Sequence, residues 1–520
     1  MAQLEHIGKQ RTKEIRPGTE LRMTVAPDED LYLRAHSRIP DTFATAEIFG
    51  MELVMGHEYK IERGMHVAIF SWHGCTIEMR GGTTVEYDAS NHVMRDYANC
   101  AGIIEQKRQK AEDMGSLDPP RVLVTGSENS GKSTLALFLS NYALRRHRRP
   151  IFVELDCGAV SCHRQLPSIP GAVSAVYADH SAYELNQEPV HPQRINLHKG
   201  IDQGNQAAHL NPNYPIGKSV WFWYGHEDWR AAPEVYWKCI AQLSCLVQAK
   251  AEMIESQAAQ EKAANSAVSA DGVKLENLTK GGIIVNAPRN PSPELLDEIV
   301  KLYSINTVVV IDDEEKYMHF INKYNEGRVP ALPSLGNDGI LKGSGSDESA
   351  LIFLDAMEEE DEDAQIDIAH VAKAGGVISN KSEEWRNRMF HMKFADYFHG
   401  PERDMVCHNF TIPLRELLIS SIQVNATIPA GSNKWADRFS VVPFTDLPGK
   451  LRHSVLAVVL APTHEEIVYS TVCGLVWVRE VSDPEDPVNA HLHLMCPSGG
   501  PLMSNYLLHG DLVGLKYFEQ

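Results

Sequence analysis

Residues 121–134 read RVLVTGSENSGKST, and this stretch decides the fold class. From Gly126 to Ser133 it matches the pattern G-x-x-x-x-G-K-[ST], in which a glycine-rich turn lets backbone N–H groups surround phosphate oxygens. The apolar run Val122–Val124 predicts a buried strand before the loop, and Leu135–Leu144 predicts a helix after it. This order of strand, loop and helix is typical of a domain that binds a nucleoside triphosphate.

The residues of the loop have defined contacts in such a domain. Lys132 should reach the β- and γ-phosphates and stabilise charge there, and the Ser133 hydroxyl should bind Mg²⁺. The positive N-terminus of the following helix faces the same anion. The predicted nucleotide-binding residues of the loop are Asn129, Ser130, Gly131, Lys132, Ser133 and Thr134.

The composition of the chain sets outer limits for its function. Its 520 residues are 43% hydrophobic, which is enough for roughly two to four domains with buried cores. A formal net charge of −20 argues against a protein that coats nucleic acid through a basic surface. The nine cysteines are scattered and never spaced C-x-x-C, as in an intracellular protein with reduced thiols and no structural zinc.

Targeting signals give little further information. The segment Met1–Lys13 is polar and charged, so no signal peptide is expected, and no apolar run reaches membrane-spanning length. The basic run Arg145–Arg149 reads either as the solvated end of the helix after the loop or as a nuclear address. We expect a nuclear or cytosolic protein that does not associate with membranes.

The pattern of apolar residues divides the chain into three blocks. Residues 1–98 carry short alternating segments that predict an N-terminal β-sandwich, and residues 426–520 predict a small C-terminal β domain. Residues 99–425 alternate strand and helix patterns, which predicts α/β architecture with a central P-loop NTPase-type parallel sheet. The strands expected in this sheet are 121–125, 151–155, 219–223, 282–286 and 307–311.

Two insertions interrupt the central block. Residues near 250–271 are rich in Ala, Glu and Gln and predict an exposed helix or its frayed extension. Residues near 332–364 are rich in Gly, Ser and Asp and include the acidic run Glu358–Asp363. Because like charges repel, this run predicts a disordered surface loop rather than a metal site.

Acidic residues follow two of the expected strands. Asp156 ends the strand beside the loop, where a carboxylate can hold Mg²⁺ through water or accept a proton from an attacking hydroxyl. The alternative is that Asp156 only caps the next turn. Asp312 and Asp313 end another strand and offer the same choice between a metal ligand and a turn residue.

Two motifs in the N-terminal block extend the pattern, A-E-I-F-G at 46–50 and W-H-G-C at 72–75. With the loop, they make the chain similar to the RNA 5′-hydroxyl polynucleotide kinase family, specifically to its cleavage-and-polyadenylation branch, which serves pre-mRNA 3′-end formation and, in some members, tRNA splicing. The other matching stretches are Thr19–Arg22, Asn141–Ala143, Arg148–Pro150, Val153–Asp156, Ile169–Gly171 and Cys496–Leu502. The resemblance spans almost the whole chain, apart from the two insertions.

The resemblance implies ATP and Mg²⁺ as cofactors, with Ser133 and Asp156 as the metal ligands. In the family the nucleoside lies between the sandwich and the central domain and contacts the acid that matches Glu20. A second contact is a lysine in the strand before W-H-G-C, where this chain has His66. An imidazole is a shorter and weaker cation than lysine, so this contact is expected in altered form.

The catalytic set implied by the resemblance is kept only in part. Asp156 matches the family's base, but the family's Asp-x-Gly-Gln ends here in Ala159. The family's Thr-x-Gly-Trp stretch, which stacks on the acceptor's terminal base, reads Asn286-Ala287-Pro288-Arg289. The loss removes stacking worth roughly 1–3 kcal/mol per base.

The family also has a lid that brings cations to the transferred phosphoryl group. Lys381-Ser382 and Trp385–Arg388 match it in place and charge, and Arg386 is the predicted lid cation beside the catalytic Lys132 and Asp156. The alternative is a solvated helix face.

These observations predict an ATP-binding subunit of the pre-mRNA cleavage and polyadenylation machinery, located in the nucleus. It would be a scaffold with a degenerate kinase site, partnered by other subunits of that machinery and reaching RNA through them. The alternative is an active 5′-hydroxyl RNA kinase with a modified clamp. A switch GTPase is disfavoured because the nearest match to N-K-x-D, Asn322–Asn325, ends in asparagine.

Overall fold

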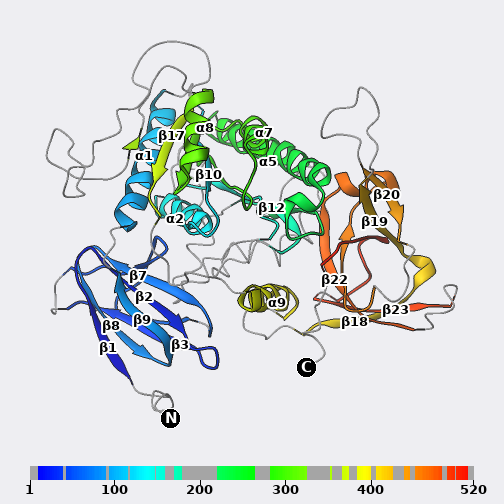
Figure 1. The fold of residues 1–520 in the computed structure, drawn as a ribbon, viewed down its shortest axis with the longest axis horizontal. Coiled ribbons are helices and arrows are strands. Elements are labelled where there is room, and N and C mark those ends of the chain that lie inside the picture. Colours follow the sequence, from blue (N-terminus) through cyan, green and yellow to red (C-terminus); the bar gives the residue numbers. More distant parts are fainter. Residues whose placement is uncertain are drawn as a thin grey trace.

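A computed structural model of the chain describes residues 10–38, 43–61, 63–89, 93–114, 118–146, 148–158, 169–177, 219–263, 281–324, 352–353, 366–373, 383–399, 406–424, 439–444, 451–482, 489–497 and 499–512. Within these ranges the strands form two N-terminal sheets, an eight-stranded central sheet and a seven-stranded C-terminal sheet, placed side by side in Figure 1. None of the helices in these ranges is long and apolar enough to cross a membrane.

The N-terminal block is a β-sandwich, as predicted. Its sheets have the orders β1-β8-β3-β6 and β5-β4-β7-β2-β9. The strands are β1 (Arg11–Ile15), β2 (Thr19–Val25), β3 (Leu31–His36), β4 (Glu47–Ile48), β5 (Met51–Glu52), β6 (Glu58–Ile61), β7 (His66–Ser71), β8 (Cys75–Arg80) and β9 (Thr83–Ala89). Alternate residues such as Leu31, Leu33 and Ala35 point into one shared core. The polar strand β1 gave no apolar pattern and was not predicted.

The central sheet has the order β13-β12-β11-β14-β10-β15-β17-β16. Its strands are β10 (Arg121–Gly126), β11 (Ile151–Glu154), β12 (Ala172–Tyr177), β13 (Ser219–Trp223), β14 (Ile283–Asn286), β15 (Thr307–Ile311), β16 (Ile352–Phe353) and β17 (Asp367–Val371). All five predicted strands are present. The parallel arrangement holds from β11 to β17, but β12 and β16 run antiparallel to their neighbours, so the sheet is mixed.

Helices cover both faces of the central sheet. They are α1 (Val93–Met114), α2 (Lys132–Arg145), α5 (Pro233–Ala263), α7 (Pro293–Tyr303), α8 (Glu314–Tyr324) and α9 (Glu383–His399), with short 3-10 turns η3 (Trp229–Ala231), η4 (Leu414–Glu416) and η5 (His464–Tyr469). Val122 and Val124 pack with α1 and α2, whereas Leu123 packs with α5, α7 and α8. Both faces of each inner strand are therefore buried, which explains the continuous apolar runs.

The two insertions are described only in part. Helix α5 continues to Ala263, so the first part of the insertion near 250–271 is helical, as predicted. The rest of that segment, and the acidic run of the insertion near 332–364, lie outside the described residues; β16 is the described part of the latter.

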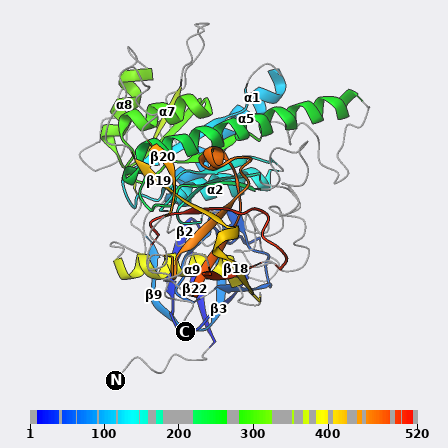
Figure 2. The same cartoon turned by 90° about the vertical axis from the view of Figure 1, so that its right-hand side faces the viewer.

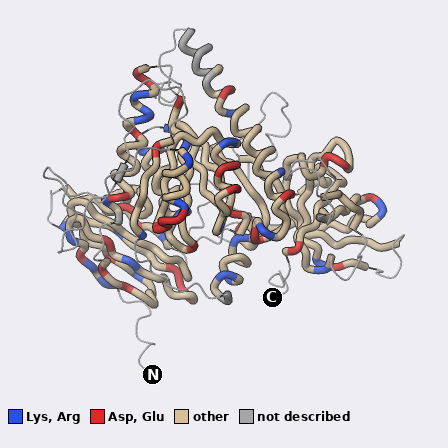
Figure 3. The backbone as a smooth tube through the Cα atoms, turned by 45° about the horizontal axis from the view of Figure 1, so that its top comes forward, with Lys and Arg blue, Asp and Glu red and all other residues tan. Residues whose placement is uncertain are grey.

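The C-terminal sheet has the order β18-β23-β22-β21-β24-β19-β20. Its strands are β18 (His408–Pro413), β19 (Leu418–Val424), β20 (Phe439–Pro443), β21 (Val455–Val459), β22 (Val472–Ser482), β23 (His491–Cys496) and β24 (Tyr506–His509). The expected boundary between residues 425 and 426 falls inside this sheet, between β19 and β20. The earlier strands belong to the same sheet, because β18 pairs with β23 and β19 pairs with β20 and β24. Figure 3 shows few charged residues along these strands.

Helix α9 joins the central and C-terminal parts. Its Phe394 and Phe398 lie in one apolar cluster with Trp221 of β13 and with Trp477 of β22. The Tyr397 hydroxyl accepts a hydrogen bond from the Leu475 amide at 2.8 Å. In Figures 1 and 2, α9 lies on the opposite side of the central sheet region from α5, α7 and α8.

The sandwich is attached to α2 through the β4–β5 hairpin. The Asn141 amide donates to the Phe49 carbonyl at 2.9 Å, and the Tyr142 hydroxyl and Arg145 guanidinium donate to the buried Glu47 carboxylate at 3.0 and 2.8 Å. Two of the motifs that carried the family resemblance, A-E-I-F-G and Asn141–Ala143, thus form one contact between the domains.

Gly50 offers a direct test of this contact. Its φ is +83°, and a Cβ added there would lie 2.8 Å from Cδ2 of Tyr142 and 3.0 Å from Cδ2 of Phe138. We expect Gly50→Ala to lower the free energy of unfolding by about 2–4 kcal/mol, the sum of left-handed backbone strain and overpacking. Urea denaturation measures this change.

Gly56 provides the matched control. It has a similar φ of +77°, but an added Cβ would meet no atom within 4 Å. Gly56→Ala should therefore show only the backbone cost of about 1–2 kcal/mol. Equal losses in the two variants would contradict the packed contact at Gly50.

Candidate functional site

The predicted phosphate-binding loop connects β10 to α2. Gly126 ends β10 at φ +146°, and a Cβ there would lie 2.2 Å from the Ile311 carbonyl oxygen, so this position has no room for a side chain. Asn129 has φ 56° and Gly131, the residue before α2, has φ 103°. These left-handed residues fold the chain tightly, which leaves the loop amides and the N-terminus of α2 to face one region.

Lys132, the first residue of α2, is folded back over the loop. Its Nζ donates to the carbonyl oxygens of Ser127 at 2.8 Å and Gly126 at 3.3 Å, and the residue is 8% exposed. Burial lowers the pKa of this lysine to about 8, against the opposing effect of Asp156. A buried ammonium bonded only to neutral carbonyls gains from a nearby anion.

Two serine hydroxyls of the loop are also consistent with a bound anion. The buried Oγ atoms of Ser127 and Ser130 have no hydrogen-bond partner among the described residues. Because a buried hydroxyl without a partner is costly, these atoms fit a ligand that accepts hydrogen bonds, as phosphate oxygens do. The residues present therefore fit a bound nucleoside triphosphate.

A buried carboxylate supports Ser133 from behind the loop. Asn286 Nδ2 donates to Oγ of Ser133 at 3.1 Å and to both oxygens of Glu154 at 2.8 and 2.9 Å. Glu154 is fully buried, and burial, reinforced by the charge of Asp156, raises its pKa to about 8. These side chains leave the carboxyl ends of neighbouring strands β11 and β14, which places them beside the loop.

Asp156 lies beside Glu154, and its charge interacts with those of several cations. Its Oδ1 accepts a hydrogen bond from the Gly158 amide at 3.1 Å, so it does form the turn that was one of the two options. Burial raises the pKa of Asp156, and the charges of Arg289, Lys132 and Arg386 counter that rise. The charge of Asp156 therefore interacts with Lys132 of the loop and with Arg386 of the predicted lid helix α9.

The second pair of acids has a structural explanation. Asp313 caps α8, because its Oδ1 accepts a hydrogen bond from the Lys316 amide at 3.1 Å and its other oxygen pairs with the Lys316 ammonium. Asp312 is exposed, with φ 51°, and lies 4.0 Å from the Lys373 ammonium. The interpretation of Asp312 and Asp313 as turn residues therefore explains both positions.

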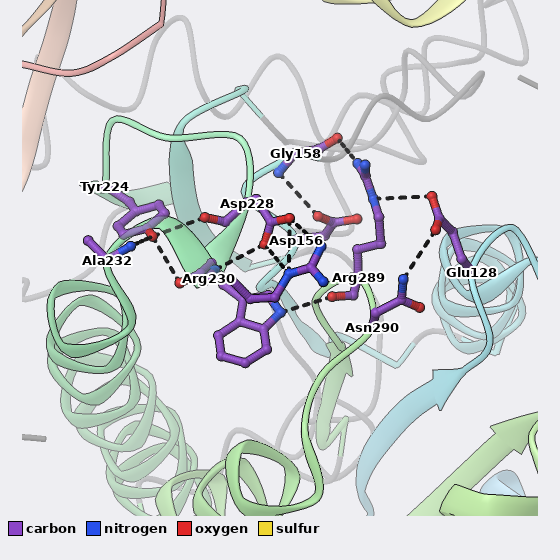
Figure 4. A network of polar contacts seen from close by, with 10 residues as sticks. Glu128, Asp156, Gly158, Tyr224, Asp228, Arg230, Ala232, Arg289 and Asn290 are labelled. Carbon is purple, nitrogen blue, oxygen red and sulfur yellow. Dashed lines mark hydrogen bonds and ion pairs between the residues drawn. The ribbon is translucent and has the colours of Figure 1, made fainter. Parts of the chain in front are cut away.

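Arg289 contacts both the turn after β11 and the phosphate-binding loop (Figure 4). Its Nη2 donates to the Gly158 carbonyl at 2.8 Å, and its Nε lies 3.9 Å from a Glu128 oxygen. The other Glu128 oxygen accepts from Asn290 Nδ2 at 3.1 Å. The stretch that replaces the family's stacking clamp is thus joined to the phosphate-binding loop by polar contacts.

The two predicted nucleoside contacts lie on the sandwich. Glu20 is buried and accepts hydrogen bonds from Arg22 Nε at 2.9 Å and Nη2 at 2.8 Å. Its charge adds to the burial that raises the pKa of Tyr97, whose hydroxyl oxygen would lie 3.1 Å from a Cβ at Gly131. Glu20 is therefore on the side of the sandwich that approaches the loop.

His66 lies at the other end of the β2–β7 pairing from Glu20, opposite Thr24. Its Nδ1 hydrogen-bonds with the Thr24 hydroxyl at 2.9 Å, and its ring centroid is 5.9 Å from that of Trp385 on α9. The structure thus places it against the predicted lid helix, and its contact with a nucleotide stays a prediction. Lys381 and Ser382 lie outside the described residues.

Several polar residues of the site were not singled out from sequence, among them Ser127, Glu128, Glu154 and Asn286. A signal existed for Glu154, since it is the one acid within the apolar strand Ile151–Glu154 and stands two residues before Asp156. No local sequence pattern identifies Glu128 as a site residue, because its partner Asn290 lies 162 residues away in the chain. In the described ranges, no group of three or more His, Cys, Asp or Glu side chains is arranged to hold a metal ion.

Three family models match consecutive parts of the chain. Residues 14–111 match the N-terminal beta-sandwich domain of polyadenylation factor, and residues 126–351 match the mRNA cleavage and polyadenylation factor CLP1 P-loop. Residues 406–514 match the pre-mRNA cleavage complex II protein Clp1. The third match begins before residue 426, in agreement with the extent of the C-terminal sheet.

Similar proteins match over nearly the full chain. The protein CLP1 homolog of Arabidopsis thaliana is 27% identical over 96% of this chain and 93% of its own, and the polyribonucleotide 5′-hydroxyl-kinase Clp1 of Homo sapiens is 25% identical over 96% and 95%. A solved wild-type complex of Clp1p with Pcf11p has a TM-score of 0.65 at 17% identity, covering 97% of both chains. A second Clp1p–Pcf11p structure, which addresses ATP loss in a glycine-to-arginine mutant, has the same TM-score at 16% identity and shares the fold.

Proposed function

The chain belongs to the Clp1 family of pre-mRNA cleavage and polyadenylation factors, and on that basis we propose that it is a nuclear, ATP-binding scaffold subunit of this machinery. The observation that carries the proposal is a complete phosphate-binding loop beside an altered acceptor side. The Lys132 ammonium and the buried hydroxyls of Ser127 and Ser130 would bind phosphate oxygens. Arg289, in contrast, occupies the stretch in which the family has its stacking clamp.

Each group of the site has a role in holding ATP. The loop amides, Lys132 and the serine hydroxyls would bind the phosphates, while Ser133, positioned by Asn286, and Asp156 would hold Mg²⁺. Bound Mg²⁺ would neutralise phosphate charge. Glu20 and the nearby Tyr97 would contact the nucleoside between the sandwich and the central domain, so bound ATP would stabilise the contact between them.

The second candidate is an active 5′-hydroxyl RNA kinase. It is favoured by the charge interactions of Asp156 with both Lys132 and Arg386, since a base, a loop lysine and a lid cation are the parts that phosphoryl transfer needs. The human relative carries a kinase name. Transfer also requires an acceptor held in line with the γ-phosphate, and the base-stacking residue for that task is absent.

We further propose that the partner is another cleavage-factor subunit docked on the central domain. The two solved Clp1p structures are complexes with Pcf11p. A net charge of −20 disfavours direct binding of RNA over a broad surface, so RNA would be reached through partners.

The scaffold and kinase proposals differ in one assay. We expect no transfer of labelled γ-phosphate from ATP to a 5′-hydroxyl RNA oligonucleotide above the level of Lys132→Ala and Asp156→Asn, because the acceptor is not clamped. Human Clp1 would serve as the positive control. Transfer by the wild type that disappears in both variants would instead establish the kinase.

A further inference from the structure

We propose that Arg289 recognises the γ-phosphate of bound ATP, so that this chain distinguishes ATP from ADP. The inference rests on the proposed nucleotide binding and adds a specificity residue at the position where the family has a base-stacking clamp.

The first argument is position. Arg289 follows β14, which lies next to β10 in the sheet, and it contacts Gly158 after β11 on the other side. Its charge acts both on Lys132, whose pKa it helps to lower, and on Asp156. Since a P-loop lysine reaches the β- and γ-phosphates, a cation beside both Lys132 and Asp156 is next to the terminal phosphate.

The second argument is the weakness of its present contacts. Among the described residues the guanidinium donates one hydrogen bond, to the neutral Gly158 carbonyl. Its interactions with the carboxylates of Glu128, at 3.9 Å, and of Asp156 are charge interactions without a hydrogen bond. A guanidinium has five N–H donors in a planar fork that suits phosphate oxygens. An anion beside the loop would therefore offer Arg289 stronger bonds than those it makes now.

The third argument is that the backbone of Arg289 is anchored, while its guanidinium is held among the described residues by a single hydrogen bond, to the Gly158 carbonyl. Trp229 Nε1 donates to the Arg289 carbonyl at 2.9 Å, and the next residue, Asn290, is held in a left-handed conformation at φ 43° with its amide on Glu128. The guanidinium, which contacts both the Gly158 carbonyl and Glu128 in Figure 4, would thus be able to turn from Glu128 to a phosphate without movement of the strand end. Glu128 would hold the arginine ready when no γ-phosphate is present.

The test compares the affinities of the nucleotide-free, full-length protein for ATP and ADP by calorimetry. We expect Arg289→Ala to weaken ATP binding on the order of ten- to a hundredfold, as for loss of a charge-assisted hydrogen bond, and to change ADP binding by less than about twofold. Arg289→Lys, which keeps the charge but loses the fork, should retain part of the preference.

Arg230→Ala is the matched control, because Arg230 lies in the same network but is paired with Asp228 and largely exposed. It should leave the ATP/ADP ratio unchanged. Equal weakening of both nucleotides by Arg289→Ala, or no change in either, would overturn the inference while leaving the proposed function intact. Failure of the wild type to bind either nucleotide would overturn the proposed function, and the inference with it.

Discussion

Replacing Lys132 with alanine should remove ATP from the purified protein and lower its thermal stability. The lysine is buried beneath the loop with its ammonium on two carbonyl oxygens, so its bonds to phosphate would form in a poorly solvated place. Loss of such charge-assisted bonds weakens binding by about a hundredfold. Chromatography of nucleotide released from the denatured protein measures the content, and thermal unfolding with and without ATP measures the linked stability.

The difference in stability between the wild type and Lys132→Ala should depend on whether ATP is present. ATP at a hundred times the wild-type dissociation constant stabilises the folded state by about 2.7 kcal/mol, of which a variant that binds a hundredfold more weakly would keep only about 0.4 kcal/mol. Lys301→Ala is the control, since this lysine lies on α7 with its side chain 66% exposed. Unchanged ATP content in Lys132→Ala would contradict the assignment of the loop as the nucleotide site.

Those parts of the fold that depend on local pattern could be predicted from sequence. The loop combines a short motif with an apolar strand and a helix within residues 121–145, so its neighbours in sequence are also its neighbours in space. The same holds for the sandwich strands, where alternation marks the buried side. Strand β12 was missed because the six residues Ala172–Tyr177 are nearly all buried and short, a pattern that does not separate strand from helix.

The rest depends on pairings between distant residues. Asn286 meets Ser133 across 153 positions and Glu154 across 132, so no spacing in the chain reports their contact. The domain boundary near 425 was wrong for the same reason: β18 and β19 are completed by β23 and β24, which come much later. Sequence could name Asp156 and Arg386 as candidates, but which cations share Asp156 depends on how α9 packs under the sheet.

Glu154 should make the stability of the protein fall as pH rises through neutrality. Burial and the charge of Asp156 raise its pKa from 4.5 to about 8 in the folded state. Below pH 4.5 the carboxyl is protonated in both the folded and unfolded chain, and between 4.5 and 8 only the unfolded chain releases the proton. Its contribution to the free energy of unfolding therefore declines with pH, by up to about 1.4 kcal/mol per pH unit, until the folded state also ionises near pH 8.

Glu154→Gln should remove this decline, because glutamine is neutral and can still accept the Asn286 hydrogen bond. Between pH 5.5 and 7.5 we expect the wild type to lose about 2–3 kcal/mol relative to the variant in urea denaturation of the nucleotide-free protein. The comparison separates Glu154 from Asp156, whose pKa is also raised but which both proteins retain. Glu315→Gln, an exposed position on α8, should follow the wild type. Parallel pH profiles for wild type and Glu154→Gln would show that Glu154 is already ionised at neutral pH. The hydrogen bonds from Asn286 and from the Asp156 amide, which donates to Glu154 at 3.0 Å, would then suffice to hold a buried charge behind the loop.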